Sequence, residues 1–169
     1  MRCVDNKKLK AFTLIEVLLY VALISIFTLV LASFWGSVNE INARNKAMSA
    51  VNTEAAFILN TISRSIRTAS AINTPTAGNA SSTLSLVKSA NPTVFSINNG
   101  VLFIQEGANP TVQLSSNQVY VNSLSFTNVT NTGTAGAVRI QLELAYVNES
   151  GKTVLDYSQT IYDTVSIRK

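Results

Sequence analysis

The first feature of the chain is a nearly continuous apolar stretch from residue 12 to residue 36. Between Phe12 and Asn39 the only charged side chain is Glu16. At a rise of about 1.5 Å per residue, a helix over these positions reaches ~42 Å, which exceeds the ~30 Å hydrocarbon core of a bilayer. The pattern therefore predicts a transmembrane segment over residues 12–36.

Apolar residues then recur at spacings of three and four along residues 37–72. This spacing is typical of an amphipathic helix that packs one face on another element. We expect one helix from Phe12 to about Ser70, with its second half packed on a domain. The apolar stripe of that half consists of Val38, Ile41, Met48, Val51, Ala55, Ile58, Leu59, Ile62, Ile66 and Ala69.

Residues 73–82 contain Pro, Gly, Thr, Ala and Ser, a composition that predicts a linker. From residue 83 to residue 169 apolar and polar positions alternate, which is typical of β-strands. The dipeptide Asn99-Gly100 predicts a tight hairpin between two of them. The expected strands are 83–88, 93–98, 101–106, 111–115, 118–126, 137–147, 153–158 and 159–167.

The alternation along residues 137–147 indicates a strand with one covered face and one wet face. The most economical cover is the apolar stripe of the helix. The sequence therefore predicts an α+β fold in which a long N-terminal helix packs on an antiparallel β-sheet. Four strand tyrosines are interpreted as rims of the core: Tyr120, Tyr146, Tyr157 and Tyr162.

Positive charge is concentrated at the N-terminus. The chain carries a net charge of +4, and residues 1–11 contain four basic residues and one acidic residue. The nearly neutral remainder has no basic footprint for a phosphate backbone, so bulk nucleic-acid binding is not expected. By the positive-inside rule the basic leader stays in the cytoplasm, which makes the C-terminal domain extracytoplasmic and inner-membrane lipid a partner of the apolar segment.

Three interpretations of this N-terminus compete. A secretory signal peptide, cut before Ser33, has an apolar run of about 7–15 residues, whereas this run is longer and contains Glu16. A plain membrane anchor leaves Glu16 as an unexplained cost, on the order of 1–3 kcal/mol. The third interpretation gives the carboxylate a role in a processed and assembled protein.

The segment from Lys10 to Leu19, KAFTLIEVLL, resembles the cleavage and methylation motif of type IV prepilins and type II secretion pseudopilins. The resemblance implies that a prepilin peptidase removes residues 1–11 by cutting between Ala11 and Phe12. It also implies that the new Phe12 amine is methylated and that Glu16, fifth in the mature chain, serves assembly with other pilin or pseudopilin subunits. The residue before the cut is usually Gly in this family, and here it is Ala11.

The residues themselves support a role for Glu16. A cut at Phe12 creates a cationic amine four residues before the carboxylate, and this spacing puts both charges on one helix face. Buried charges are retained mainly when they are paired. The partner of Glu16 is its own Phe12 amine or that of a neighbouring subunit, and the sequence leaves both open.

The order of long helix, linker and β-rich half also resembles the pilin architecture. Residues 119–126 and the final Ile167-Arg168 are loosely similar to secretion pseudopilin J or minor pilin W. The resemblance implies a structural subunit, a minor pilin or pseudopilin, which moves from the membrane into a type IV pilus-like fibre or a type II secretion pseudopilus. The alternative function is a membrane-anchored extracytoplasmic adhesin or binding module.

Composition limits the chemistry. The chain has no histidine, and its one cysteine, Cys3, lies in the leader. This excludes a His-activated nucleophile, a His or Cys metal site and an intrachain disulfide. The acidic residues of the β-rich half are dispersed, without the spacing of a calcium loop or an acid–base pair. We therefore expect no enzyme activity, no metal and no cofactor.

Overall fold

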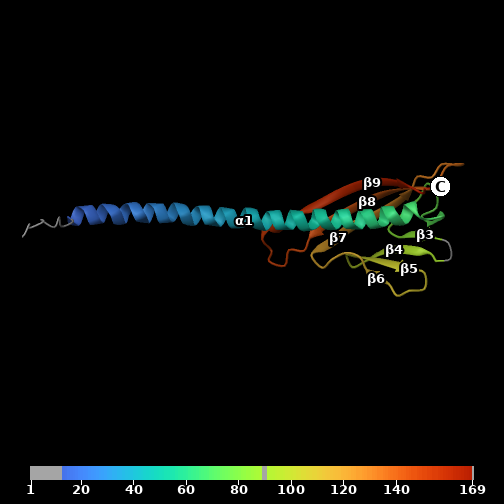
Figure 1. Ribbon diagram of the computed structural model, residues 1–169, viewed down its shortest axis with the longest axis horizontal. Coiled ribbons are helices and arrows are strands. Elements are labelled where there is room, and N and C mark those ends of the chain that lie inside the picture. The colour runs from blue at the N-terminus through green and yellow to red at the C-terminus, as the bar shows by residue number, and fades with distance from the viewer. Residues whose placement is uncertain (1–12, 89–90, 169) are drawn as a thin grey trace, which may run out of the picture. The chain divides into compact units, whose positions relative to one another are not determined.

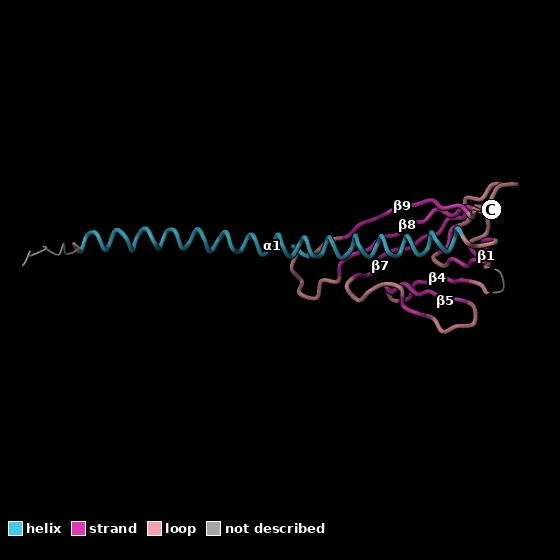
Figure 2. Tube along the Cα trace, in the orientation of Figure 1, coloured by secondary structure: helices cyan, strands magenta, loops and turns pink. Residues whose placement is uncertain are grey.

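The computed structural model describes residues 13–88 and 91–168. The chain divides into two units, Met1–Asn42 and Ala43–Lys169. Helix α1 (Leu14–Arg67) contributes residues to both units (Figure 1), while the strands lie in the second unit (Figure 2). The expected α+β fold, with a long N-terminal apolar helix and antiparallel strands, is confirmed.

The strands of the second unit form two antiparallel sheets, a division that the sequence pattern did not reveal. The five-stranded sheet has the order β1-β3-β4-β5-β6, and the four-stranded sheet has the order β2-β7-β8-β9. The strands are β1 Ala71–Thr74, β2 Ala80–Ser81, β3 Leu84–Val87, β4 Thr93–Asn98, β5 Val101–Glu106, β6 Val112–Gln113, β7 Val119–Asn128, β8 Ala137–Tyr146 and β9 Ser158–Ser166.

One hydrophobic core joins the helix to both sheets. The buried side chains of α1 recur at spacings of three and four from Ala47 to Ile66, as the stripe predicted. The stripe begins later than expected, since Ile41 is 59% exposed. The central core members are Val51, Ala55, Ile58, Ile62 and Ile66 from α1, Leu84, Leu86, Phe95 and Leu102 from the larger sheet, and Phe126, Ile140, Leu142 and Leu144 from the smaller one.

The structure corrects the expected elements at three places. The strand expected at 153–158 is absent before Ser158, where β9 begins, and its place is taken by the 3-10 turn Thr153–Leu155, in which Leu155 N–H bonds Lys152 O and Asp156 N–H bonds Thr153 O. The segment 73–82, expected as a linker, contains the end of β1 and the whole of β2. Helix α1 ends at Arg67 rather than near Ser70, whose N–H bonds Val87 O at 2.7 Å.

The hairpin predicted at Asn99-Gly100 is confirmed and helps to connect the two sheets. Both turn residues have positive φ, 48° and 73°, and they lie between the paired Asn98 and Val101. The Gly100 carbonyl accepts a hydrogen bond of 2.8 Å from Val121 N–H on β7. A Cβ atom on Gly100 would overlap the Tyr120 ring. Glycine is therefore required here both by the backbone and by the close approach of β7.

We expect Gly100→Ala to lower the free energy of unfolding by about 2–4 kcal/mol. Alanine is strained at the left-handed φ of this position, and its Cβ must also displace the Tyr120 ring. Gly133→Ala is the matched control. Gly133 also has a positive φ, 82°, but nothing lies within 4 Å of its added Cβ, so about 1–2 kcal/mol is expected. Thermal unfolding followed by circular dichroism compares the two. Equal losses would show that the Tyr120 contact is unimportant.

Candidate functional site

The first candidate site is the beginning of α1. Its first turn closes on the Thr13 carbonyl, which accepts hydrogen bonds from Glu16 N–H at 3.1 Å and Val17 N–H at 3.3 Å. Glu16 is the acidic residue of this turn and is half-buried. A carboxylate at a helix N-terminus interacts favourably with the exposed N–H groups and the helix dipole. The backbone therefore accommodates Glu16, although the surrounding side chains are apolar.

The helix surface that follows Glu16 is apolar and uncovered in the described chain. Its large hydrophobic side chains, from Val17 to Trp35, are at least 48% exposed. Soluble monomers rarely expose an apolar patch of more than a few hundred Å². Within α1, an 18-residue window has a mean hydropathy of 2.6, and none of it is buried. By length and composition this is one helix that can cross a membrane, which is consistent with a single membrane anchor.

Hydroxyl groups within the apolar segment find partners on their own helix. Ser25 Oγ donates to Val21 O at 2.7 Å, and Thr28 Oγ1 donates to Ile24 O at 2.8 Å. Ser33 Oγ makes the same type of bond to Leu29 O at 3.1 Å. Such bonds to the carbonyl four residues earlier satisfy the hydroxyl without water. Sequence reasoning missed this feature, although the isolated Ser and Thr residues of the run are its visible signal.

The other predicted site residues lie outside the described residues. Ala11 and Phe12, which flank the expected cleavage site and include the expected methylation site, belong to the part of the chain that is not described. The structure therefore places Glu16 and the apolar surface, but not the amine that processing would create.

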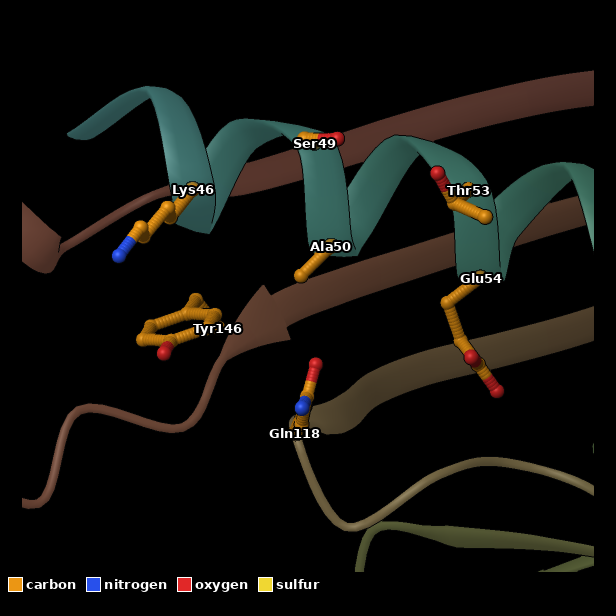
Figure 3. Close-up of a pocket in the computed structure, with 7 residues that line it drawn as sticks. All are labelled: Lys46, Ser49, Ala50, Thr53, Glu54, Gln118 and Tyr146. Atoms are coloured by element: carbon orange, nitrogen blue, oxygen red, sulfur yellow. The ribbon is translucent and has the colours of Figure 1, made fainter. Parts of the chain in front are cut away.

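A second candidate is a surface groove of about 480 Å³ in the globular unit. Figure 3 shows α1 side chains above Gln118, which directly precedes β7, and Tyr146, the last residue of β8. The carboxylate that lines the groove belongs to Glu54. It is already engaged, because Glu54 Oε1 accepts a hydrogen bond of 2.8 Å from Ser116 N–H. The groove is lined by Lys46, Ser49, Ala50, Thr53, Glu54, Gln118 and Tyr146.

This groove was not visible in the sequence because its lining comes from three distant segments. Its polar groups include one ammonium and one carboxylate, and the carboxylate holds the loop before β7 against α1. Within the described ranges, no group of three or more Asp, Glu, His or Cys side chains is arranged to hold a metal ion. Glu54 therefore has a structural role at this groove, the anchoring of a loop.

Comparison with known proteins gives a result for the N-terminus alone. No curated protein and no solved structure matches the chain. The family model described as "Prokaryotic N-terminal methylation motif" matches residues 6–32. This range includes the second half of the basic leader, the Ala11-Phe12 bond, Glu16 and most of the exposed apolar surface. The match supports a pilin-like protein with a prepilin-type N-terminus.

Proposed function

We propose that this chain is a structural subunit, a minor pilin or pseudopilin, of a type IV pilus-like fibre or a type II secretion pseudopilus. The observation that carries the proposal is the methylation motif at residues 6–32, which overlaps the exposed apolar start of α1. In this proposal a prepilin peptidase removes residues 1–11, and lipid holds the apolar helix until other subunits replace it.

The apolar surface supports the exchange of lipid for protein partners. Side chains such as Leu23, Phe27 and Leu31 are 50–64% exposed, so each retains surface that another helix can cover. Lipid tails and a second apolar helix offer these side chains similarly apolar surroundings, so burial alone gives little preference for the assembled state over the membrane. A polar interaction between chains would therefore favour assembly, and Glu16 is the one charged residue of this segment that can supply it.

Glu16 then acts as an assembly residue through charge pairing. A carboxylate in hydrocarbon is costly, and so is the cationic amine that cleavage before Phe12 creates. Pairing the two removes part of both costs. We propose that the partner amine belongs to a neighbouring subunit, because a pair between two chains makes assembly favourable, while a pair within one chain does not.

One prediction concerns the processing of the N-terminus. The mature protein is expected to begin with an N-methylated Phe12 when it is expressed with a prepilin peptidase. Mass spectrometry of the isolated protein measures this directly, and cells that lack the peptidase provide the control, in which Met1 or the residue after it should be retained. A mature chain that starts at Ser33 would establish a secretory signal instead, and an uncut chain in both strains would favour a membrane-anchored binding module.

A separate prediction concerns the role of Glu16. Glu16→Val should leave membrane insertion intact, because the segment becomes more apolar, and cleavage after Ala11 should persist. Its amount in sheared fibres should fall at least tenfold, since breaking a buried ion pair costs about 3–5 kcal/mol and about 1.4 kcal/mol corresponds to a factor of ten.

The control for this experiment is Glu40→Val, the same change at the next carboxylate of α1, where the side chain is exposed. Immunoblots of fibre and membrane fractions compare both variants with the wild type. Glu40→Val should enter fibres normally. Wild-type amounts of Glu16→Val in the fibre would disprove pairing between subunits.

A further inference from the structure

Strand β9 forms the one long edge of the two described sheets. The edge strands of the five-stranded sheet are β1, with four residues and a register shift, and β6, with two residues. The other edge of the four-stranded sheet is β2, also with two residues. In contrast, β9 has nine residues and pairs with β8 alone. Short or irregular edges resist pairing with other chains, and β9 lacks this protection.

In β9 the backbone N–H and C=O groups of every second residue point to the open edge. Tyr146 N–H bonds Tyr157 O at 2.9 Å, and Ile167 N–H bonds Gly136 O at 2.8 Å, so odd-numbered residues face β8 at both ends of the ladder. Hydrogen bonds alternate along an antiparallel strand. The even-numbered residues 158–166 therefore point their N–H and C=O groups away from β8. One of these N–H groups is engaged locally, since Thr164 N–H bonds Asp163 Oδ1 at 2.8 Å.

The side chains of β9 offer one obstacle to pairing. The strand contains no Pro, Lys or Arg, but an inward-pointing charge also protects an edge, and Asp163 is such a residue. Its carboxylate is half-buried and accepts a hydrogen bond of 3.2 Å from Ser63 Oγ on α1, so it is partly satisfied within its own chain. Tyr162, expected at a core rim, is instead 66% exposed. The outward face of the strand is thus uncharged, with one aromatic ring at its centre.

We propose that β9 pairs antiparallel with β9 of a second copy of this chain, with Tyr162 opposite Tyr162. The argument for a second copy is the order of the outward residues, which is the same in both directions: Ser158, Thr160, Tyr162, Thr164 and Ser166. Antiparallel pairing about Tyr162 sets Ser against Ser, Thr against Thr and Tyr against Tyr. Pairs of Thr residues and pairs of aromatic residues stabilise neighbouring strands.

Charge also permits this self-pairing. Asp163 lies opposite Ile161 of the second copy in this register, so the two carboxylates are not juxtaposed. The pairing must displace Asp163 from Thr164 N–H, and an edge contact alone buries less area than a standard interface of about 1,600 Å². The association is therefore weak for one pair and becomes effective where many copies meet.

The direction of β9 identifies which copies meet. Ser63 contacts Asp163, and Arg67 O accepts a hydrogen bond from Arg168 N–H, so this part of α1 and β9 run in the same direction. Antiparallel pairing of β9 therefore joins copies whose packed α1 segments run in opposite directions. Subunits stacked in one direction do not form this contact, which instead links two oppositely directed assemblies. This inference concerns the globular unit and does not depend on the proposed processing.

The test is a charge exchange at the symmetric position. The full chain is purified in detergent as Tyr162→Lys and Tyr162→Glu, and self-association is measured by light scattering over a range of concentrations. Each variant alone should associate at least tenfold more weakly than the wild type, because like charges meet on the axis. An equimolar mixture should recover the wild-type association. Association that is unchanged in the single variants, or a mixture without recovery, would overturn the proposal.

Gln141→Lys is the matched control, since Gln141 is exposed and pairs with Tyr162 from the neighbouring strand but is not at the edge. It should associate as the wild type does. Register is tested by cysteine pairs in a Cys3→Ser background, because Cα atoms of hydrogen-bonded pairs lie about 5.5 Å apart, within disulfide range. Tyr162→Cys should crosslink to itself, and Thr160→Cys to Thr164→Cys. Equal crosslinking of Thr160→Cys to itself would exclude this register.

Discussion

The contact between one face of α1 and two sheets is the interaction on which the globular unit depends. Val51, Ile58, Ile62 and Ile66 are fully buried, and each such side chain contributes about 1.5–3 kcal/mol by leaving water. The intervening residues include Asn, Ser and Thr, which are weak helix formers. Packing therefore stabilises this half of the helix more than intrinsic propensity does. Loss of the stripe would remove both the helix and the common core of the sheets.

The same helix serves two environments because its composition changes along its length. From Leu14 to Trp35 apolar side chains surround the helix, and the hydroxyl groups bond to backbone carbonyls. From Ala47 onward the buried apolar residues lie on one stripe, and most exposed positions are polar, with Phe57 as an exposed exception. The first pattern is typical of a lipid-facing helix and the second of a helix at a domain surface. Glu16 interrupts the first pattern, and this exception carries the proposed assembly role.

Much of the fold could be predicted from the sequence, because its strongest signals are local. Strands β4 and β5 have the predicted bounds, since a turn sequence with positive φ fixes the hairpin between them. Strands β1 and β2 were missed because they lie at the expected end of the helix and in the segment rich in Pro, Gly, Thr, Ala and Ser, which has no alternating pattern. Their pairing depends on distant partners, β3 and β7. The division into two sheets was missed for the same reason.

The candidate site was predictable to a different extent. The lone carboxylate in an apolar run is a local anomaly, so Glu16 could be identified without the structure. Three segments form the groove around Tyr146, and no local pattern connects them. The free edge of β9 is also a property of sheet order, which alternation does not encode. Sequence therefore supplied the hypothesis for the N-terminus, whereas the surfaces of the globular unit required the fold.

The central claim is that residues after the apolar segment form a folded unit with its own core, and a fragment of residues 37–169 tests it most directly. The buried hydrophobic core residues all lie between Ala47 and Ile167, so the fragment retains the complete core. The fragment should stay soluble without detergent. Its circular dichroism spectrum should show both helix and strand signal, with a cooperative thermal transition. An unfolded spectrum, or a fragment that stays soluble only in detergent, would contradict the account.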